Sequence, residues 1–223
     1  DITLHVRPGD SVALVGPSGG GKTTLCSLIP RFYDVTEGRI LVDGQDIRGL
    51  TLESLRKNIG VVQQEVYLFA GSVFENISYG RPGASREEVV EAAKLAGAHD
   101  FIMEFPDGYD TDLGQGGVNV SGGQKQRLCI ARALLAHPKI LILDDSTSAV
   151  DTATDARIRE ALRARHADIT TIIIAQRITS VCEADQIIVL DEGRVAAVGT
   201  HEELMRSSEI YREVYTSQQK GVA

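Results

Sequence analysis

Two adjacent aspartates, Asp144 and Asp145, end the apolar run LILDD that starts at Leu141. A short apolar run predicts a buried strand, and open α/β sheets bind their ligands beyond the carboxyl ends of such strands. One carboxylate there can hold Mg²⁺ through water, so Asp144 is a candidate metal anchor. The alternative for Asp144 is a helix N-cap or a solvated strand end.

A glycine-rich segment, GPSGGGKT, fits the spacing GxxxxGK[ST] from Gly16 to Thr23. Polyphosphate needs backbone N–H groups turned inward around it, and the glycines permit that turn. Lys22 then supplies a point charge, and the Thr23 hydroxyl can join a Mg²⁺ shell. We expect the strand that carries Asp144 to lie next to this loop, since the two motifs would then share one metal ion.

A second anion-ready helix start, VSGGQKQR, places Ser121 as an N-cap before Gly122 and Gly123. The first loop already cradles a nucleotide within this chain, so one nucleotide cannot occupy both. A plain Ser N-cap is the default explanation. In company with the other two motifs, the segment points to a second protomer whose nucleotide this surface covers.

The elements that must position these motifs alternate between strand and helix patterns. Near-continuous apolar strands separated by helices predict a buried, mostly parallel sheet, and a helical stretch between residues 72 and 137 predicts an inserted subdomain. The predicted strands are 2–6, 11–15, 39–44, 59–63, 139–144, 170–175, 186–190 and 194–199, and the predicted helices are 23–28, 51–59, 85–98, 98–105, 121–136, 152–165 and 201–218.

The ordered motifs GPSGGGKTT, VVQQE, VSGGQ, LILDD, SAVD and IIIAQR resemble the nucleotide-binding domain of an ATP-binding cassette (ABC) transporter over essentially the whole chain. VYLFAGSVFENI and DLGQGGVNVSGGQ resemble the exporter type. The resemblance implies an α/β fold of the P-loop NTPase kind, with a mostly parallel core sheet, an antiparallel β subdomain and an inserted α-helical subdomain. It divides residues 1–223 into an ATPase core, about 1–71 and 138–223, and a helical subdomain, about 72–137, without a transmembrane domain.

The family implies a head-to-tail dimer that holds two ATP molecules with Mg²⁺, joined to a membrane domain at the cytoplasmic face of a cell membrane. Gln64 resembles the glutamine that touches the metal and responds to the membrane domain; its neighbour Gln63 is the weaker candidate. The implied ATP-binding residues are Gly16, Pro17, Ser18, Gly19, Gly20, Gly21, Lys22, Thr23, Thr24 and Gln64. The implied metal-binding residues are Thr23, Gln64 and Asp144.

Two further sets of positions follow from the same resemblance. The partner's ATP would contact Ser121, Gly122, Gly123 and Gln124. Ser148 and Asp151 belong to SAVD, which resembles the D-loop that crosses the dimer interface.

Two positions depart from the family pattern. The residue after the strand aspartate is usually glutamate but here is Asp145, and the switch-loop histidine is replaced by Gln176. With Lys22, these are the implied catalytic positions. A general base must come within about 2.6–3.2 Å of its water, so one missing methylene retracts Asp145 out of reach. Gln176 can donate a hydrogen bond but cannot carry a positive charge. We expect this chain's own site to bind ATP and turn it over slowly.

A division of labour explains these departures: in heterodimeric ABC exporters one chain commonly carries a degenerate site, while its intact signature completes the partner's competent site. VSGGQ here is intact except for Val120 in place of the usual leucine. Drift in a weak homodimeric enzyme is the alternative. A regulatory ATP-binding module and a DNA-repair type ATPase are others, although the latter would separate the motifs with a long coiled coil.

The composition argues against some classes of function. A net charge of -8 and a pI near 5.2 argue against a nucleic-acid surface. No apolar run approaches the ~20 residues of a membrane span. The three cysteines, Cys26, Cys129 and Cys182, are far apart and predict reduced core thiols. The five histidines show no ligand spacing. The cargo and the adenine-stacking residue cannot be read from this sequence.

Overall fold

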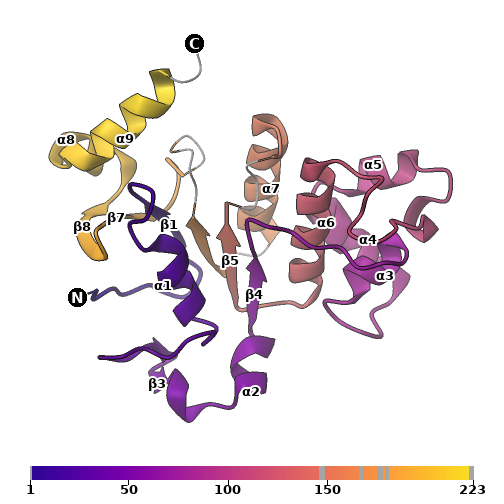
Figure 1. Ribbon diagram of the computed structural model, residues 1–223, viewed down its shortest axis with the longest axis horizontal. Coiled ribbons are helices and arrows are strands. Elements are labelled where there is room, and N and C mark those ends of the chain that lie inside the picture. The colour runs from indigo at the N-terminus through magenta and orange to yellow at the C-terminus, as the bar shows by residue number, and fades with distance from the viewer. Residues whose placement is uncertain (1, 146–148, 166–167, 175–177, 179–180, 221–223) are drawn as a thin grey trace.

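The structure is a computed structural model, shown in Figure 1, and it describes residues 2–145, 149–165, 168–174, 178 and 181–220. Its strands are β1 (Ser11–Val15), β2 (Leu41–Val42), β3 (Gln45–Asp46), β4 (Ile59–Val62), β5 (Ile140–Asp144), β6 (Thr170–Ile174), β7 (Gln186–Asp191) and β8 (Arg194–Gly199). Its α-helices are α1 (Lys22–Leu28), α2 (Leu52–Lys57), α3 (Val73–Ser78), α4 (Arg86–Leu95), α5 (His99–Glu104), α6 (Gly122–Leu135), α7 (Thr152–Arg165), α8 (His201–Ser207) and α9 (Glu209–Lys220). The 3₁₀ turns are η1 (Ile47–Gly49) and η2 (Gly108–Asp110).

A six-stranded sheet runs through the centre in the order β4-β5-β6-β1-β7-β8. All of its neighbouring strands pair in parallel except β7 and β8, which form an antiparallel pair across the turn at Glu192 and Gly193. A separate two-stranded antiparallel sheet joins β2 and β3. The prediction of a mostly parallel α/β sheet with a small antiparallel part is therefore confirmed.

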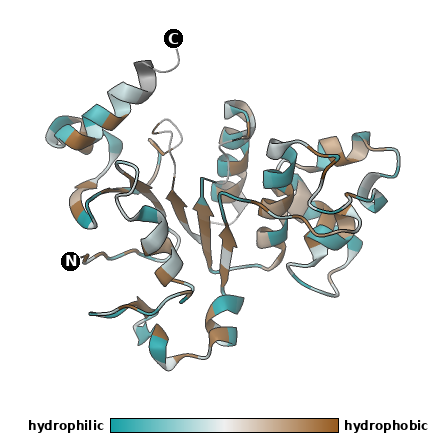
Figure 2. Ribbon diagram, in the orientation of Figure 1, coloured by the Kyte–Doolittle hydropathy of each residue, from teal (hydrophilic) through white to brown (hydrophobic). Residues whose placement is uncertain are grey.

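The sheet is buried on both faces because its side chains alternate between two layers of helices. On β1, Val12 and Leu14 pack in a cluster with Cys26 of α1, whereas Ala13 and Val15 face a cluster with Tyr211 of α9. Figure 2 shows the central strands in brown between helices of mixed colour. Apolar runs without polar alternation therefore form the core strands of this chain.

Helices α3 to α6 lie together at one side of the sheet, beyond β4 in Figure 1. The predicted helix at 85–98 begins with a capping box: Ser85 Oγ accepts from the Glu88 backbone N–H, and the Glu88 side chain accepts from the Ser85 N–H. Val89, Ala93 and Ala96 are buried on one face of that helix. The division of the chain at about residues 72 and 137 stays a prediction. No helix among the described residues has the length and apolar content needed to cross a membrane.

Two predicted elements differ in the structure. Residues 2–6 lie in no strand ladder within the described part of the chain, although Leu4 and Val6 pack against the core. A strand is defined by a hydrogen-bonded neighbour, which an alternating pattern alone cannot supply. The predicted C-terminal helix is divided at Ser208, whose extended backbone ends α8 and whose hydroxyl accepts from the Tyr211 N–H at the start of α9.

A buried amide connects the loop before α3 to α6. Asn76 is buried, and its side chain accepts from the Phe69 N–H at 2.9 Å and from Arg132 Nη2 at 3.0 Å. The same amide donates to the carbonyls of Phe69 and Ser72. Arg132 also donates through Nε to the Asn76 carbonyl at 2.8 Å. Four hydrogen bonds on one side chain fix this loop on the helices beneath it.

We predict that Asn76→Ala lowers the free energy of unfolding by about 2–3 kcal/mol, because it leaves buried backbone groups and Arg132 without their partner. Urea denaturation of the purified chain measures this value. The control is Asn58→Ala, since Asn58 is exposed and its side chain makes one hydrogen bond to Ser54, and it should cost less than about 1 kcal/mol. Equal losses in the two variants would contradict the structural role of Asn76.

Candidate functional site

The glycine-rich loop between β1 and α1 touches the backbone of β7. A Cβ added to Gly16 would lie 2.0 Å from the Leu190 carbonyl oxygen, and Gly16 has a φ of +139°, a conformation that L side chains rarely adopt. Gly20 also approaches the Leu190 carbonyl, where an added Cβ would lie at 3.0 Å. Gly19 has a φ of +79°, but its surroundings are open. The glycine spacing is therefore required by a close approach of two backbones at Gly16.

Lys22, the first residue of α1, folds back over this loop. Its ammonium donates to the carbonyls of Gly16 at 3.0 Å and Pro17 at 2.8 Å. Burial lowers the pKa of Lys22, and the charge of Asp144 opposes that shift. The side chain therefore places a positive charge over the loop, where an anion inside the loop would meet it.

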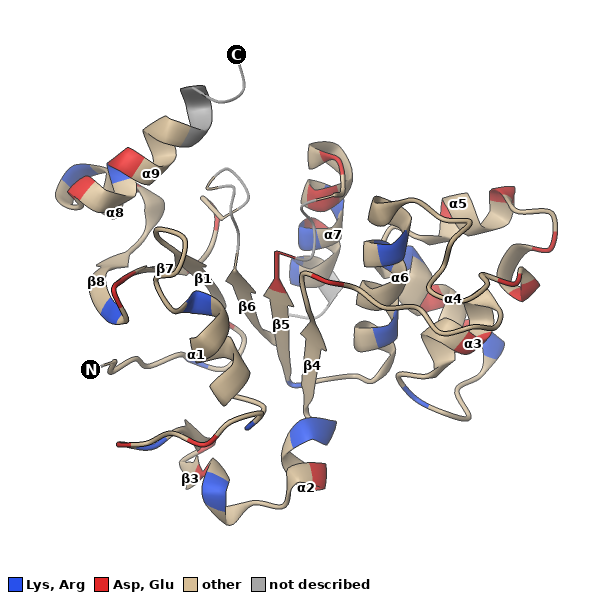
Figure 3. Ribbon diagram, viewed as in Figure 1, with Lys and Arg blue, Asp and Glu red and all other residues tan. Residues whose placement is uncertain are grey.

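Thr23 and Asp144 come together from different elements. Thr23 Oγ1 donates to Asp144 Oδ1 at 3.4 Å. Burial raises the pKa of Asp144, while the Thr23 hydrogen bond and the Lys22 charge lower it. Figure 3 shows the acidic end of β5 on the same side of the sheet as the basic start of α1. A carboxylate and a hydroxyl at this separation fit two positions in the shell of a hydrated Mg²⁺ ion.

The expectation that the Asp144 strand lies next to the glycine-rich loop is confirmed at the end of the strand, where Asp144 contacts Thr23. The strands β1 and β5 themselves are not neighbours, because β6 lies between them and separates them by roughly 10 Å. Helix α1 closes the distance because it leaves the loop across the sheet and brings Thr23 over the end of β5. A parallel sheet requires crossover connections, so neighbours in the chain need not be neighbours in the sheet.

Asp145 follows Asp144 with a left-handed backbone, φ +45°. Its N–H donates to the Ile174 carbonyl of β6 at 2.8 Å, and its carboxylate accepts from Gln64 Nε2 at 3.5 Å. Asp145 is buried. The chain thus brings the predicted residues Gln64, Asp144 and Asp145 to the same edge of the sheet, whereas Gln176 lies outside the described residues.

Ser121 is the N-cap of α6, as predicted, and it forms a capping box with Gln124. Its Oγ accepts from the Gln124 N–H at 3.2 Å, and its own N–H donates to Gln124 Oε1 at 3.0 Å. Ser121 and Gly122 are exposed. Helix α6 packs on the face of β5 that carries Leu141 and Leu143, whereas α1 packs on the face that carries Ile142, and Figure 1 shows β4 and β5 between the two helices. Because Ser121 Oγ accepts in the capping box, its hydroxyl hydrogen remains for a partner outside this helix.

The segment between β5 and α7 is described from Ala149 onward, so the predicted residue Ser148 lies outside the described residues. Asp151 Oδ1 accepts from the Thr154 N–H at 2.9 Å, and this bond lowers the pKa of Asp151. Asp151 therefore caps the start of α7.

Sequence reasoning missed the buried Gln126, whose Oε1 accepts from the Ala149 N–H at 3.1 Å. The signal was present in the pattern, because Gln126 shares the buried helix face of Ile130 and Ala133 at spacings of four and seven.

Comparison with known proteins agrees with this geometry. The family model for ABC transporter matches residues 1–148. The chain belongs to the ABC transporter family. "Putative multidrug export ATP-binding/permease protein YgaD" of Bacillus subtilis is 50% identical over 98% of this chain, and a Staphylococcus aureus protein of the same description is 53% identical over 98%. The structure of a bacterial Atm1-family ABC exporter with ATP bound superimposes with a TM-score of 0.92 and 49% identity over 95% of this chain.

The chain spans 38% of the length of these two relatives and 37% of the exporter chain. It has the ABC ATPase fold, and as an ATPase domain of this family it binds ATP with Mg²⁺. ATP and Mg²⁺ supply the bond to be broken and the charge neutralisation that hydrolysis needs. The observed donor set of Lys22, Thr23 and Asp144 fits such a pair. Within the described residues, no three His, Cys, Asp or Glu side chains converge as a metal site made by protein alone.

We predict that Gly16→Ala of this ABC domain weakens ATP binding at least about 100-fold, because a methyl group there collides with the Leu190 backbone and displaces the loop. Titration with a fluorescent ATP analogue measures the affinity. Gly19→Ala is the matched control: it meets open space and bears only the left-handed strain, so its loss should stay below about tenfold. Similar losses in both variants would show that loop flexibility, not the contact with β7, matters.

Proposed function

We propose that this chain is the ATP-driven motor domain of an ABC exporter and works in a head-to-tail dimer around two ATP molecules, at the cytoplasmic face of the membrane. The observation that carries the proposal is that α6, which Ser121 caps, and α1, which follows the glycine-rich loop, pack on opposite faces of β5. A second protomer can bring its own nucleotide to Ser121, and Ser121 suits that contact because it is exposed and its hydroxyl only accepts in the capping box.

Within its own site, the backbone of residues 16–24 cradles the phosphates, and the close fit of Gly16 against Leu190 holds that backbone in place. Lys22 exchanges its two loop carbonyls for the terminal phosphates. Thr23 and Asp144 would hold the Mg²⁺ that accompanies ATP, and Gln64 approaches the same edge of the sheet. These residues bind and orient the nucleotide.

The own site turns ATP over slowly because Asp145 has little freedom to reach a water. Its backbone N–H is fixed to β6 and its φ of +45° leaves few alternative positions. Its carboxylate is one methylene shorter than a glutamate and already faces Gln64. A well-placed general base contributes ~10²–10⁴-fold, so a misplaced one removes a factor of that order. The partner's site, completed by Ser121 to Gln124, then supplies the faster turnover.

The membrane domain docks on an aromatic groove beside β4. The groove has a volume of about 390 Å³, and its lining includes Gln63, Tyr67, Phe69 and Arg132. Tyr67, Phe69 and Tyr79 are all exposed, and the Phe69 and Tyr79 rings lie 4.6 Å apart. Exposed aromatic rings around a concavity are typical of binding hot spots. The relatives extend well beyond this chain and are described as permeases, so their remaining length can supply the helix that fills the groove.

We predict that Ser121→Ala lowers the ATPase rate of the assembled exporter at least about tenfold, while Asp145→Asn lowers it less than about threefold, because Ser121 acts on the faster site. Steady-state phosphate release measures both rates. Ser85→Ala is the matched control, since Ser85 forms the same capping box on α4. If Ser85→Ala lowers the ATPase rate as much as Ser121→Ala does, the loss comes from removing a helix cap alone.

Equal losses from Ser121→Ala and Asp145→Asn would contradict the division of labour and favour a homodimer of weak sites. The variant Asp145→Glu tests the opposite change. It restores the missing methylene, and the proposal expects it to raise turnover of the exporter.

We predict that Tyr79→Asp lowers transport by the intact exporter at least about fivefold and leaves ATP affinity unchanged, because it places a charge at the edge of the groove, beside the lining residue Phe69. Transport into inverted vesicles and ATP titration measure the two properties. Val198→Asp is the control: Val198 is also exposed, but it lies on β8 at the far edge of the sheet from β4. Unchanged transport in Tyr79→Asp would remove the groove as the docking site.

A further inference from the structure

The start of α6 packs against the segment that follows β5 in the same chain. A Cβ added to Gly123 would lie 2.6 Å from the Ala149 carbonyl oxygen, and one added to Gly122 would touch the Ala149 side chain at 3.5 Å. Val150, the next residue, is buried in the core. Gly123 therefore permits an approach of two backbones that a side chain at this position would prevent.

Gln126 fixes this approach from the helix side. It lies one turn after Gly123, is only 4% exposed, and its Oε1 accepts from the Ala149 N–H at 3.1 Å. A buried amide is costly unless it is hydrogen-bonded, and an apolar side chain of equal size would fill the same space at no such cost. A polar group at this point of a buried helix face therefore indicates a positional role for the hydrogen bond.

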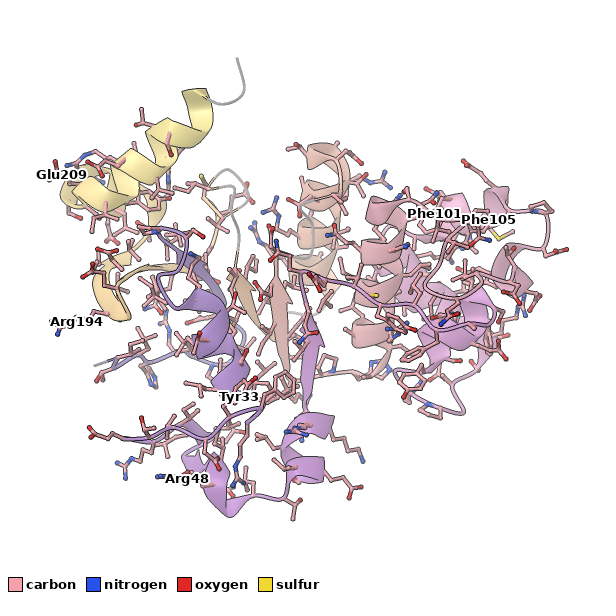
Figure 4. All side chains as sticks on the ribbon, in the orientation of Figure 1. Tyr33, Arg48, Phe101, Phe105, Arg194 and Glu209 are labelled. Atoms are coloured by element: carbon pink, nitrogen blue, oxygen red, sulfur yellow. The ribbon has the colours of Figure 1, made fainter. Side chains whose placement is uncertain are left out.

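Arg127 fixes the other flank of the helix start. Its guanidinium donates to the Gly97 carbonyl at 2.8 Å and to the Gly123 carbonyl at 3.3 Å, and it lies 4.6 Å from the ring centre of Phe101 on α5. Phe101 is labelled in Figure 4 among the helices α3 to α6. A Cβ on Gly97 would touch Thr154 of α7 at 3.4 Å. The start of α6 is thus held between α5 and the segment that leads into α7.

We propose that Gln126 is a positioning residue for the partner's ATP site: its hydrogen bond to Ala149 makes Ser121 to Gln124 and residues 149–151 move as one unit. The inference rests on the proposed dimer, in which Ser121 to Gln124 face the partner's nucleotide and the SAVD segment, which resembles a D-loop, crosses the interface. The distance between the two segments then stays fixed whether the dimer is open or closed. One protomer therefore presents both segments to the second protomer in a single step.

The test compares Gln126→Leu with Gln126→Glu in the intact exporter. Gln126→Leu keeps the volume and removes the acceptor, and amide hydrogen exchange of a peptide covering residues 149–155 should speed up about five- to tenfold, the size of one lost hydrogen bond. The maximal ATPase rate should fall by a similar factor with KM for ATP unchanged. Gln126→Glu keeps an acceptor oxygen at the same reach and should retain more of both properties.

Gln45→Leu is the matched control, because Gln45 is exposed on β3 and the same change there should alter neither property. If Gln126 served packing alone, the apolar Gln126→Leu would keep a higher ATPase rate and slower exchange than the charged Gln126→Glu. That order would overturn the proposal. Unchanged exchange at residues 149–155 in Gln126→Leu would overturn it as well. Amide exchange does not depend on ATP turnover. If Ser121→Ala left the ATPase rate of the exporter unchanged, the proposed function would be wrong, but the exchange result for Gln126 would still hold.

Discussion

The contact on which the site depends is the approach of the Gly16 backbone to the Leu190 carbonyl at the end of β7. Because β1 and β7 are parallel neighbours, this contact fixes the height at which the chain leaves the sheet and turns into α1. Helix α1 then carries Lys22 back over the loop and Thr23 across β6 to Asp144. A larger residue at position 16 would move all of these groups together, so the motif is rigid before any ligand binds.

A second close approach of two backbones, between Gly123 and Ala149, fixes the start of α6 in the same way. The molecule therefore has two helix starts that are each fixed by a glycine against a carbonyl, on α1 and on α6. The first combines with the acidic end of β5, and the second carries an exposed serine. Under the proposed function, the second would meet the nucleotide of another chain.

Much of this could be predicted from the sequence because the signals are local. Glycine spacing, the N-cap at Ser121 and the apolar strand runs are short-range patterns, and the structure has them where they were expected. The order of strands cannot be read from such patterns, so the position of β6 between β1 and β5 comes from the structure alone. The buried amides Asn76 and Gln126 were missed for a related reason: their partners, Phe69 and Ala149, lie on other elements, and only the fold brings them together.

Neighbouring glutamines at the end of β4 contact different parts of the molecule. Gln63 lines the aromatic groove, and Gln64 approaches the carboxylate of Asp145. One peptide unit therefore separates the residue that lines the groove from the residue that contacts Asp145. A single-residue insertion just before this pair would move Gln63 to the position that reaches the acid, and a deletion would move the carboxylate of Glu65 there. Such length changes should be far rarer here than point substitutions, and this segment should keep its length across relatives even where its residue types vary.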